Sequence, residues 1–161
     1  MHPSSAGYQL SLANTLSATP VVNVASVPQR SPFRYPGGKT WLVPRVRQWL
    51  LSLRWKPSVL VEPFAGGAII GLTVAFEGLA EAVLLVEIDE QVAAVWKTIL
   101  GDDSEWLVER ILSFNLTLDN LGAELASTDS SVRQRAFQAI VKNRPFHGGI
   151  LPPGSRPLKT G

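Results

Sequence analysis

The chain has 161 residues, a mass of 17.5 kDa and a formal net charge of +2, a length that suits one domain. It contains no cysteine and only two histidines, which excludes disulfides, a thiol nucleophile and a cysteine-type zinc site and disfavours any metal site. No apolar run reaches the ~18 residues that a membrane span needs, and the N-terminus lacks the basic start of a secretory signal. These features predict a soluble cytoplasmic protein without a membrane partner.

The charges are unevenly distributed along the chain. Residues 1–60 carry 7 Lys and Arg and no acid, residues 61–129 carry all 13 Asp and Glu with 2 basic residues, and residues 130–161 carry 6 basic residues and no acid. Two basic flanks around an acidic middle are compatible with a polyanion-binding face. Basic residues that merely solvate helices and tails would give the same pattern, so charge alone leaves both interpretations open.

The first part of the chain divides into a tail and a helix. Residues 1–30 are rich in Ser and Pro and contain one charged residue, which predicts a disordered tail with ordered sequence from about Ser31. Apolar residues at helical spacing predict a helix over 41–53, with Thr40 as its N-cap. For each of the five tryptophans, core packing is the expected environment.

Residues 58–88 have the pattern of a β-α-β unit. Short apolar runs at 58–62 and 82–88 read as buried strands, and 66–77 between them reads as a helix. Two strands joined through a helix of this length are expected to be parallel, with a right-handed crossover. Helical spacing then recurs around 92–99, 106–114, 118–125 and 132–141, and the chain turns loop-like from Asn143. The fold class predicted is therefore α/β.

The turn after the first strand has the composition of a ligand site. Gly66 and Gly67 lie between strand and helix, where glycine lets a ligand approach the backbone and the helix N-terminus favours anionic groups. Glu87 follows the second strand, and a carboxylate there can accept both hydroxyls of an adenosine ribose. The glycines alone are a weak signal, because any α/β protein can have such a turn.

A second segment, Phe33 to Thr40, ends in Gly-Gly-Lys-Thr. It resembles the end of a phosphate-binding P-loop, but that motif requires glycine where Phe33 stands and a buried strand before it. We therefore reject an ATPase interpretation.

Together these segments resemble the Dam-like (D12) class of adenine-specific DNA methyltransferases. Four family patterns occur in order: FRYPGGK at 33–39, EPFAGGA at 62–68, Glu-Ile-Asp at 87–89, and Asn-Arg at 143–144 followed by Gly-Ile at 149–150. The resemblance covers about residues 32–161. No single piece is specific, but their combination and order are.

The resemblance implies a Rossmann-like fold that binds S-adenosylmethionine through residues 31–142. In such enzymes the aromatic at Tyr35 and the lysine at Lys39 contact the cofactor, the lysine pairing with its carboxylate, and the acid at Glu87 holds the ribose. The implied cofactor residues are Tyr35, Gly37, Gly38, Lys39, Glu62, Pro63, Phe64, Ala65, Gly66, Gly67, Glu87 and Ile88. Residues 143–161 would begin the target-recognition region, with Lys142, Asn143 and Arg144 binding DNA.

The family's catalytic loop, Asp/Asn/Ser-Pro-Pro-aromatic, has no match in this sequence. The one Pro-Pro pair, Pro152-Pro153, is preceded by Leu151 and followed by Gly154, so neither the hydrogen-bond acceptor nor the stacking ring is present. We therefore expect an incomplete, N-terminal part of a bacterial or phage restriction-modification or DNA-marking enzyme. Such a part would be inactive alone, with DNA and a separately encoded C-terminal half as partners.

Two alternatives remain open at this point. One is a non-catalytic nucleic-acid-binding remnant, which cofactor affinity would separate from the first interpretation. The other is a nicotinamide-dinucleotide domain. Ala68 argues against it, because the dinucleotide motif requires its middle glycine at that position.

Overall fold

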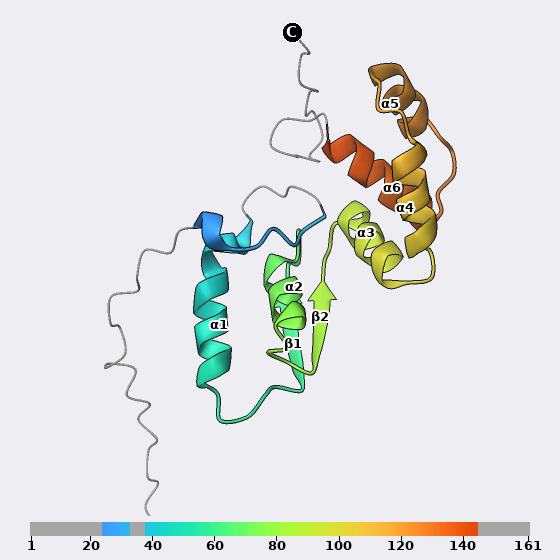
Figure 1. Cartoon of the computed structure of the whole chain (residues 1–161). Coiled ribbons are helices and arrows are strands. Elements are labelled where there is room, and N and C mark those ends of the chain that lie inside the picture. The colour runs from blue at the N-terminus through green and yellow to red at the C-terminus, as the bar shows by residue number, and fades with distance from the viewer. Residues whose placement is uncertain (1–23, 33–37, 145–161) are drawn as a thin grey trace, which may run out of the picture.

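The computed structural model describes residues 24–32 and 38–144. This part of the chain is a mixed α/β structure with six α-helices and a two-stranded sheet (Figure 1). In chain order the elements are η1 (Val24–Ser26), η2 (Lys39–Leu42), α1 (Val43–Ser52), β1 (Val59–Pro63), α2 (Ile69–Phe76), β2 (Ala82–Val86), α3 (Glu90–Leu100), α4 (Ser104–Ser113), α5 (Leu118–Leu125) and α6 (Val132–Asn143). None of the described helices has the length and apolar character needed to cross a membrane.

The β-α-β unit is confirmed. β1 and β2 pair in parallel with Val59 opposite Ala82 and Pro63 opposite Val86, and α2 connects them. The helix begins at Ile69, later than the sequence pattern predicts. Gly66 and Ala68 have φ angles of +52° and +50°, outside the helical region, so the glycine-rich segment forms a turn before the helix starts.

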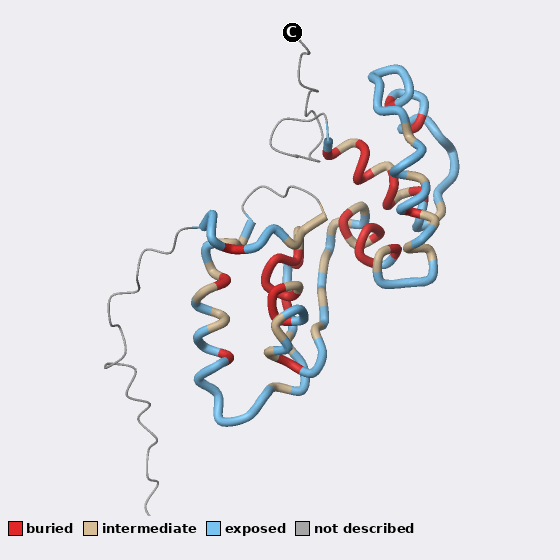
Figure 2. Tube along the Cα trace, in the orientation of Figure 1, coloured by how far each residue is buried: buried red, intermediate tan, exposed pale blue. Residues whose placement is uncertain are grey.

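Among the described residues, elements cover only one face of the sheet, so the prediction of two buried strands is wrong for the other face. Side chains alternate along both strands, and α2 is the described helix that packs on both of them. The opposite face leaves apolar side chains about half exposed: Val59, Val61, Leu84 and Val86, at 48–53%. Figure 2 shows β2 as alternating exposed and intermediate residues, beside the mostly buried first part of α2.

A first hydrophobic core joins α1 to α2. Val43 and Leu50 of α1 pack with Ile70 and Val74 of α2. Val27 belongs to the same core and is only 4% exposed, so the packed chain begins before Ser31, earlier than the sequence suggests. Residues 1–23, the rest of the predicted tail, lie outside the described residues.

A second core holds α3, α4, α5 and α6 together, on the other side of β2 from α1 (Figure 1). Phe137 of α6 is fully buried, and Phe114 meets it edge-on at 5.2 Å between ring centroids. α3 packs chiefly against α6. Side-chain caps at Asp89 and Ser131 begin these two helices, and the four helices predicted from spacing are confirmed.

Two expectations for the first helix and its tryptophans are wrong. Thr40 lies inside η2 and is not an N-cap; α1 starts after Leu42 without a side-chain cap. Trp96 is buried and Trp106 partly buried, but the other three are exposed, namely Trp41, Trp49 and Trp55. Trp49 is exposed because α1 meets α2 along one stripe and Trp49 lies beside that stripe. Trp41 lies in η2 and Trp55 follows the end of α1.

Candidate functional site: a turn and cavity at the carboxyl end of the sheet

The turn that follows β1 is held in an unusual backbone conformation. Phe64, Gly66 and Ala68 all have positive φ, at +54°, +52° and +50°. This region is open to glycine but costly for phenylalanine and alanine. Such conformations persist where surrounding contacts over-determine them, and they concentrate at ligand sites.

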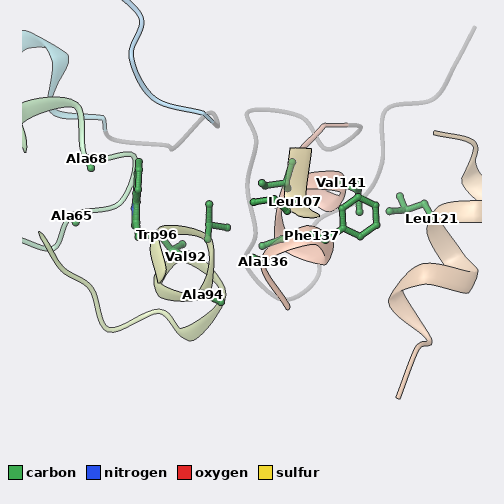
Figure 3. Packing of buried hydrophobic residues seen from close by; sticks show 13 residues of the cluster. Ala65, Ala68, Val92, Ala94, Trp96, Leu107, Leu121, Ala136, Phe137 and Val141 are labelled. Atoms are coloured by element: carbon green, nitrogen blue, oxygen red, sulfur yellow. The ribbon is translucent and has the colours of Figure 1, made fainter. Parts of the chain in front are cut away.

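Gly66 is anchored at both of its backbone polar groups. Its N–H donates to Glu87 Oε2 at 2.6 Å, and its carbonyl accepts from the indole Nε1 of Trp96 at 2.8 Å. Beside it, the Ala65 N–H donates to the Val86 carbonyl at 2.9 Å. The turn is therefore tied to the end of β2 and to α3, and Trp96 lies between the turn and the helix core (Figure 3).

The Glu87 carboxylate serves as a backbone anchor in this arrangement. Its other oxygen, Oε1, accepts from the N–H groups of Ile88 and Asp89 at 2.9 and 3.0 Å. Three of about four acceptor positions of the carboxylate are thus occupied. No donor from the described residues fills the fourth position, which a ligand hydroxyl could occupy without displacing the turn.

Lys39 and Glu62 form a partly buried ion pair beneath the same turn. Lys39 Nζ lies 3.0 Å from Glu62 Oε1 and donates to the Phe64 carbonyl at 2.5 Å. Glu62 is only 4% exposed, and its Oε2 accepts from the Gly71 N–H at 2.6 Å. The Nζ–Oε1 contact has ion-pair distance but not hydrogen-bond angles, which leaves Oε1 without a hydrogen-bond donor. Glu62 therefore neutralises Lys39 and places a negative charge at the start of α2.

A cavity of about 610 Å³ opens above this turn. Its walls come from four parts of the described chain, namely Gln29, Ser31 and Pro32, residues 38–40, residues 63–69, and Arg144. The charged residues in these walls are Lys39 and Arg144, both cationic. A cavity with this lining suits a ligand that carries an anionic group.

The predicted cofactor residues are partly gathered at this cavity. Gly38, Lys39 and residues 63–67 line it. Glu62 does not line the cavity but pairs with Lys39, which does. Glu87 likewise accepts a hydrogen bond from Gly66, which lines the cavity. Ile88 is 88% exposed beside Glu87. Tyr35 and Gly37 lie outside the described residues, and their predicted roles stay predictions.

The three predicted DNA-binding residues are placed in different surroundings. Asn143 is 3% exposed, so its side chain lies inside the protein. Lys142 lines a second cavity, of about 510 Å³, between the start of α3 and the ends of α5 and α6. Arg144 reaches the first cavity, where its Nη2 donates to the Pro32 carbonyl at 3.3 Å.

Two residues of this site were missed by sequence reasoning. Trp96 was assigned to a helix core, and its indole N–H gives no sequence signal of a partner thirty residues away. Arg144 was assigned to DNA, because its basic neighbours suggested a phosphate contact. Only the folding of α6 against α3 brings it to the cavity.

The parallel β-α-β unit, with a glycine turn, an acid after the second strand and a cavity at the carboxyl end of the sheet, defines an α/β protein with a candidate ligand site. The family model of the D12 class N6 adenine-specific DNA methyltransferases matches residues 35–138. The match covers more than half of the chain, and the chain belongs to this family, as its motifs indicated. No curated protein matches the sequence.

Proposed function

We propose that the cavity binds S-adenosylmethionine, as part of a Rossmann-like methyltransferase that transfers a methyl group to N6 of adenine in DNA. The observation that carries the proposal is the Gly66 turn, fastened to Glu87 and opening into a cavity with cationic walls. Membership of the D12 family supports both the reaction and the DNA substrate.

The residues present fit this cofactor at both of its ends. The free acceptor position of Glu87 suits a ribose hydroxyl, and Ile88 next to it offers an exposed apolar surface for a purine ring. The methionine end would lie along residues 64–67, whose backbone is held open by the two bonds to Gly66. Arg144 provides positive charge for a carboxylate there, and Lys39 is a second cation in the cavity wall whose charge Glu62 already balances.

The bound cofactor would supply an electrophilic methyl group. Transfer of that group to adenine N6 would break the bond from carbon to sulfur and release a proton from the amine. The groups that orient the adenine amine are an acceptor side chain and a proline carbonyl in the family pattern. Because the sequence has no such loop, we propose that this polypeptide binds cofactor but needs a second segment carrying the loop for transfer.

The test is calorimetric titration of the full chain with S-adenosylmethionine, S-adenosylhomocysteine and NAD. We expect saturable binding of the two adenosyl sulfur compounds and none of NAD, because the turn lacks the middle glycine that a pyrophosphate needs. Binding of NAD alone would assign the cavity to a dinucleotide. Absence of binding by all three would remove the cofactor assignment and leave nucleic-acid binding as the function to test.

A further inference from the structure

We infer that Arg144 is a cofactor-binding residue that pairs with the carboxylate of the methionine moiety, rather than a DNA-binding residue. The inference rests on the proposed function, because it names the partner of one group of the proposed cofactor. It assigns to the end of α6 a role in a cavity formed largely by segments at the other end of the chain.

The first step is the charge of the cavity. Its two charged wall residues, among the described ones, are Lys39 and Arg144. The Lys39 ammonium already faces Glu62 at 3.0 Å and the Phe64 carbonyl at 2.5 Å. Its charge is therefore balanced within the protein, and a ligand carboxylate would have to compete with a buried glutamate for it.

The second step concerns the helix that begins at this cavity. A helix N-terminus commonly binds an anion through its free N–H groups. Here the Gly71 N–H in the first turn of α2 is bound by Glu62 at 2.6 Å. The protein's own carboxylate thus occupies part of that position.

Arg144 is differently placed. Among the described residues its guanidinium donates one hydrogen bond, to the Pro32 carbonyl at 3.3 Å, and no described carboxylate forms an ion pair with it. By contrast, Arg133 and Arg135 on the same helix face Asp103 and Glu90 at 3.3 and 3.0 Å. A neutral carbonyl leaves both the charge and most of the five N–H donors of Arg144 available to a ligand.

The chemistry of the match is specific. A guanidinium presents two parallel N–H groups that fit the two oxygens of a carboxylate, whereas an ammonium binds as a point charge. The carbonyl of Pro32 holds the guanidinium at the cavity, so less side-chain entropy is lost when the ligand binds.

The experiment compares S-adenosylmethionine with its decarboxylated form, which lacks only the group in question. We expect the full chain to bind the carboxylated compound more tightly by about tenfold, the equivalent of one good charged hydrogen-bond pair. Arg144→Gln should lose that preference while binding the decarboxylated compound as well as the unchanged chain does. Arg144→Lys should keep part of the preference, because it retains charge without the planar fork.

The decarboxylated compound also reports whether the variant is folded. Arg133→Gln is the matched control, since it removes an arginine of the same helix that lies outside the cavity, and it should change neither affinity. Equal loss of both compounds in Arg144→Gln, or no loss, would overturn the inference while leaving the proposed function standing. So would a variant that keeps the preference but loses affinity for duplex DNA, which would assign Arg144 to phosphate. If the unchanged chain binds neither compound, the proposed function fails and this inference with it.

Discussion

At the scale of single residues, Glu87 illustrates how one carboxylate can serve a turn and a ligand together. It accepts the Gly66, Ile88 and Asp89 N–H groups, and in the proposed complex it also accepts a ribose hydroxyl. An Asp at this position is one methylene shorter. The longer Glu reaches across to Gly66 as well as to its own chain.

Glu87→Ala is therefore expected to weaken S-adenosylmethionine binding by about 1.5–3 kcal/mol, the cost of a hydrogen bond to a charged group. Calorimetry at one temperature measures the change. Glu90→Ala is the control, because that side chain is 81% exposed and pairs with Arg135. Equal affinity of the Glu87 variant and the unchanged chain would remove Glu87 from the site.

Glu77 is a residue whose protonation affects stability. It forms two hydrogen bonds with Arg47, both at 2.6 Å, and faces Arg30 at 3.5 Å. The hydrogen bond from Arg47 is the main reason that the pKa of Glu77 is lowered from its ordinary 4.5, and the charges of both arginines add to this effect against a smaller opposing cost of burial. Through these contacts Glu77, at the end of α2, is joined to α1 by Arg47 and to the segment before η2 by Arg30.

Because the pKa of Glu77 is lower in the folded state, its contribution to stability is complete above pH 4.5 and is lost as the pH falls through the folded value. The free energy of unfolding should thus decrease on acidification. Glu77→Gln should be less stable near neutral pH by roughly 1 kcal/mol or less, as is usual for partly exposed ion pairs, and should converge with the unchanged chain in acid. Urea denaturation of the unchanged chain and of Glu77→Gln across this pH range measures the two free energies of unfolding. A difference between them that stays constant at all pH values would contradict the assignment of the effect to Glu77.

At the scale of elements, α2 approaches the sheet closely because it carries glycine where the two meet. A Cβ at Gly71 would lie 2.8 Å from both Glu62 Oε2 and Leu85 Cδ2 and 3.0 Å from Val83 Cγ1. These distances are shorter than normal contacts. The small residue therefore permits both the packing of the helix and the bond from its backbone N–H to Glu62.

Gly71→Ala is expected to destabilise the protein by about 1–3 kcal/mol through overpacking. Gly122→Ala in α5 makes the same substitution where the added Cβ would have no atom within 4 Å beyond its chain neighbours and the backbone of its own helix. That control should be neutral or more stable by up to about 1 kcal/mol, since alanine is the better helix former. Thermal unfolding of the two variants tests the pair, and equal effects would mean that α2 and the sheet can separate without cost.

At the scale of the whole molecule, charge is partly balanced between the basic and acidic segments. Arg133 and Arg135 of the basic segment pair with Asp103 and Glu90 of the acidic one. Fewer cations are thus free to meet phosphate than the charge pattern alone suggests. Binding of DNA would depend on the remaining basic groups.

The whole-molecule prediction concerns catalysis. We expect the 161-residue chain alone to transfer no methyl group to mixed-sequence DNA, because adenine N6 must be held about 3–3.5 Å from the methyl carbon and the residues that would hold it are missing from the sequence. Tritiated methyl incorporation measures this. A second polypeptide that carries the loop is expected to restore incorporation.

We expect that second polypeptide to cover the apolar side chains exposed on the open face of the sheet, Val61 and Leu84 among them. Its addition should therefore also protect this face in hydrogen exchange. Incorporation above background by the purified chain alone would mean that the catalytic groups lie within the residues present.

The sequence by itself determined the β-α-β unit, the order of the helices, the family and the glycine turn after the first strand. These follow from apolar spacing and short motifs, which are local properties of the chain. It could not show that α2 covers one face of the sheet, that Val27 is part of a core, or that Trp96 and Arg144 reach the same site as Gly66. The first depends on how α2 packs on the two strands and the second on the packing of α1 with α2. The third depends on contacts between residues 30 and 112 positions apart. Only the tertiary structure decides them, because each is a contact between separate elements and not a local pattern.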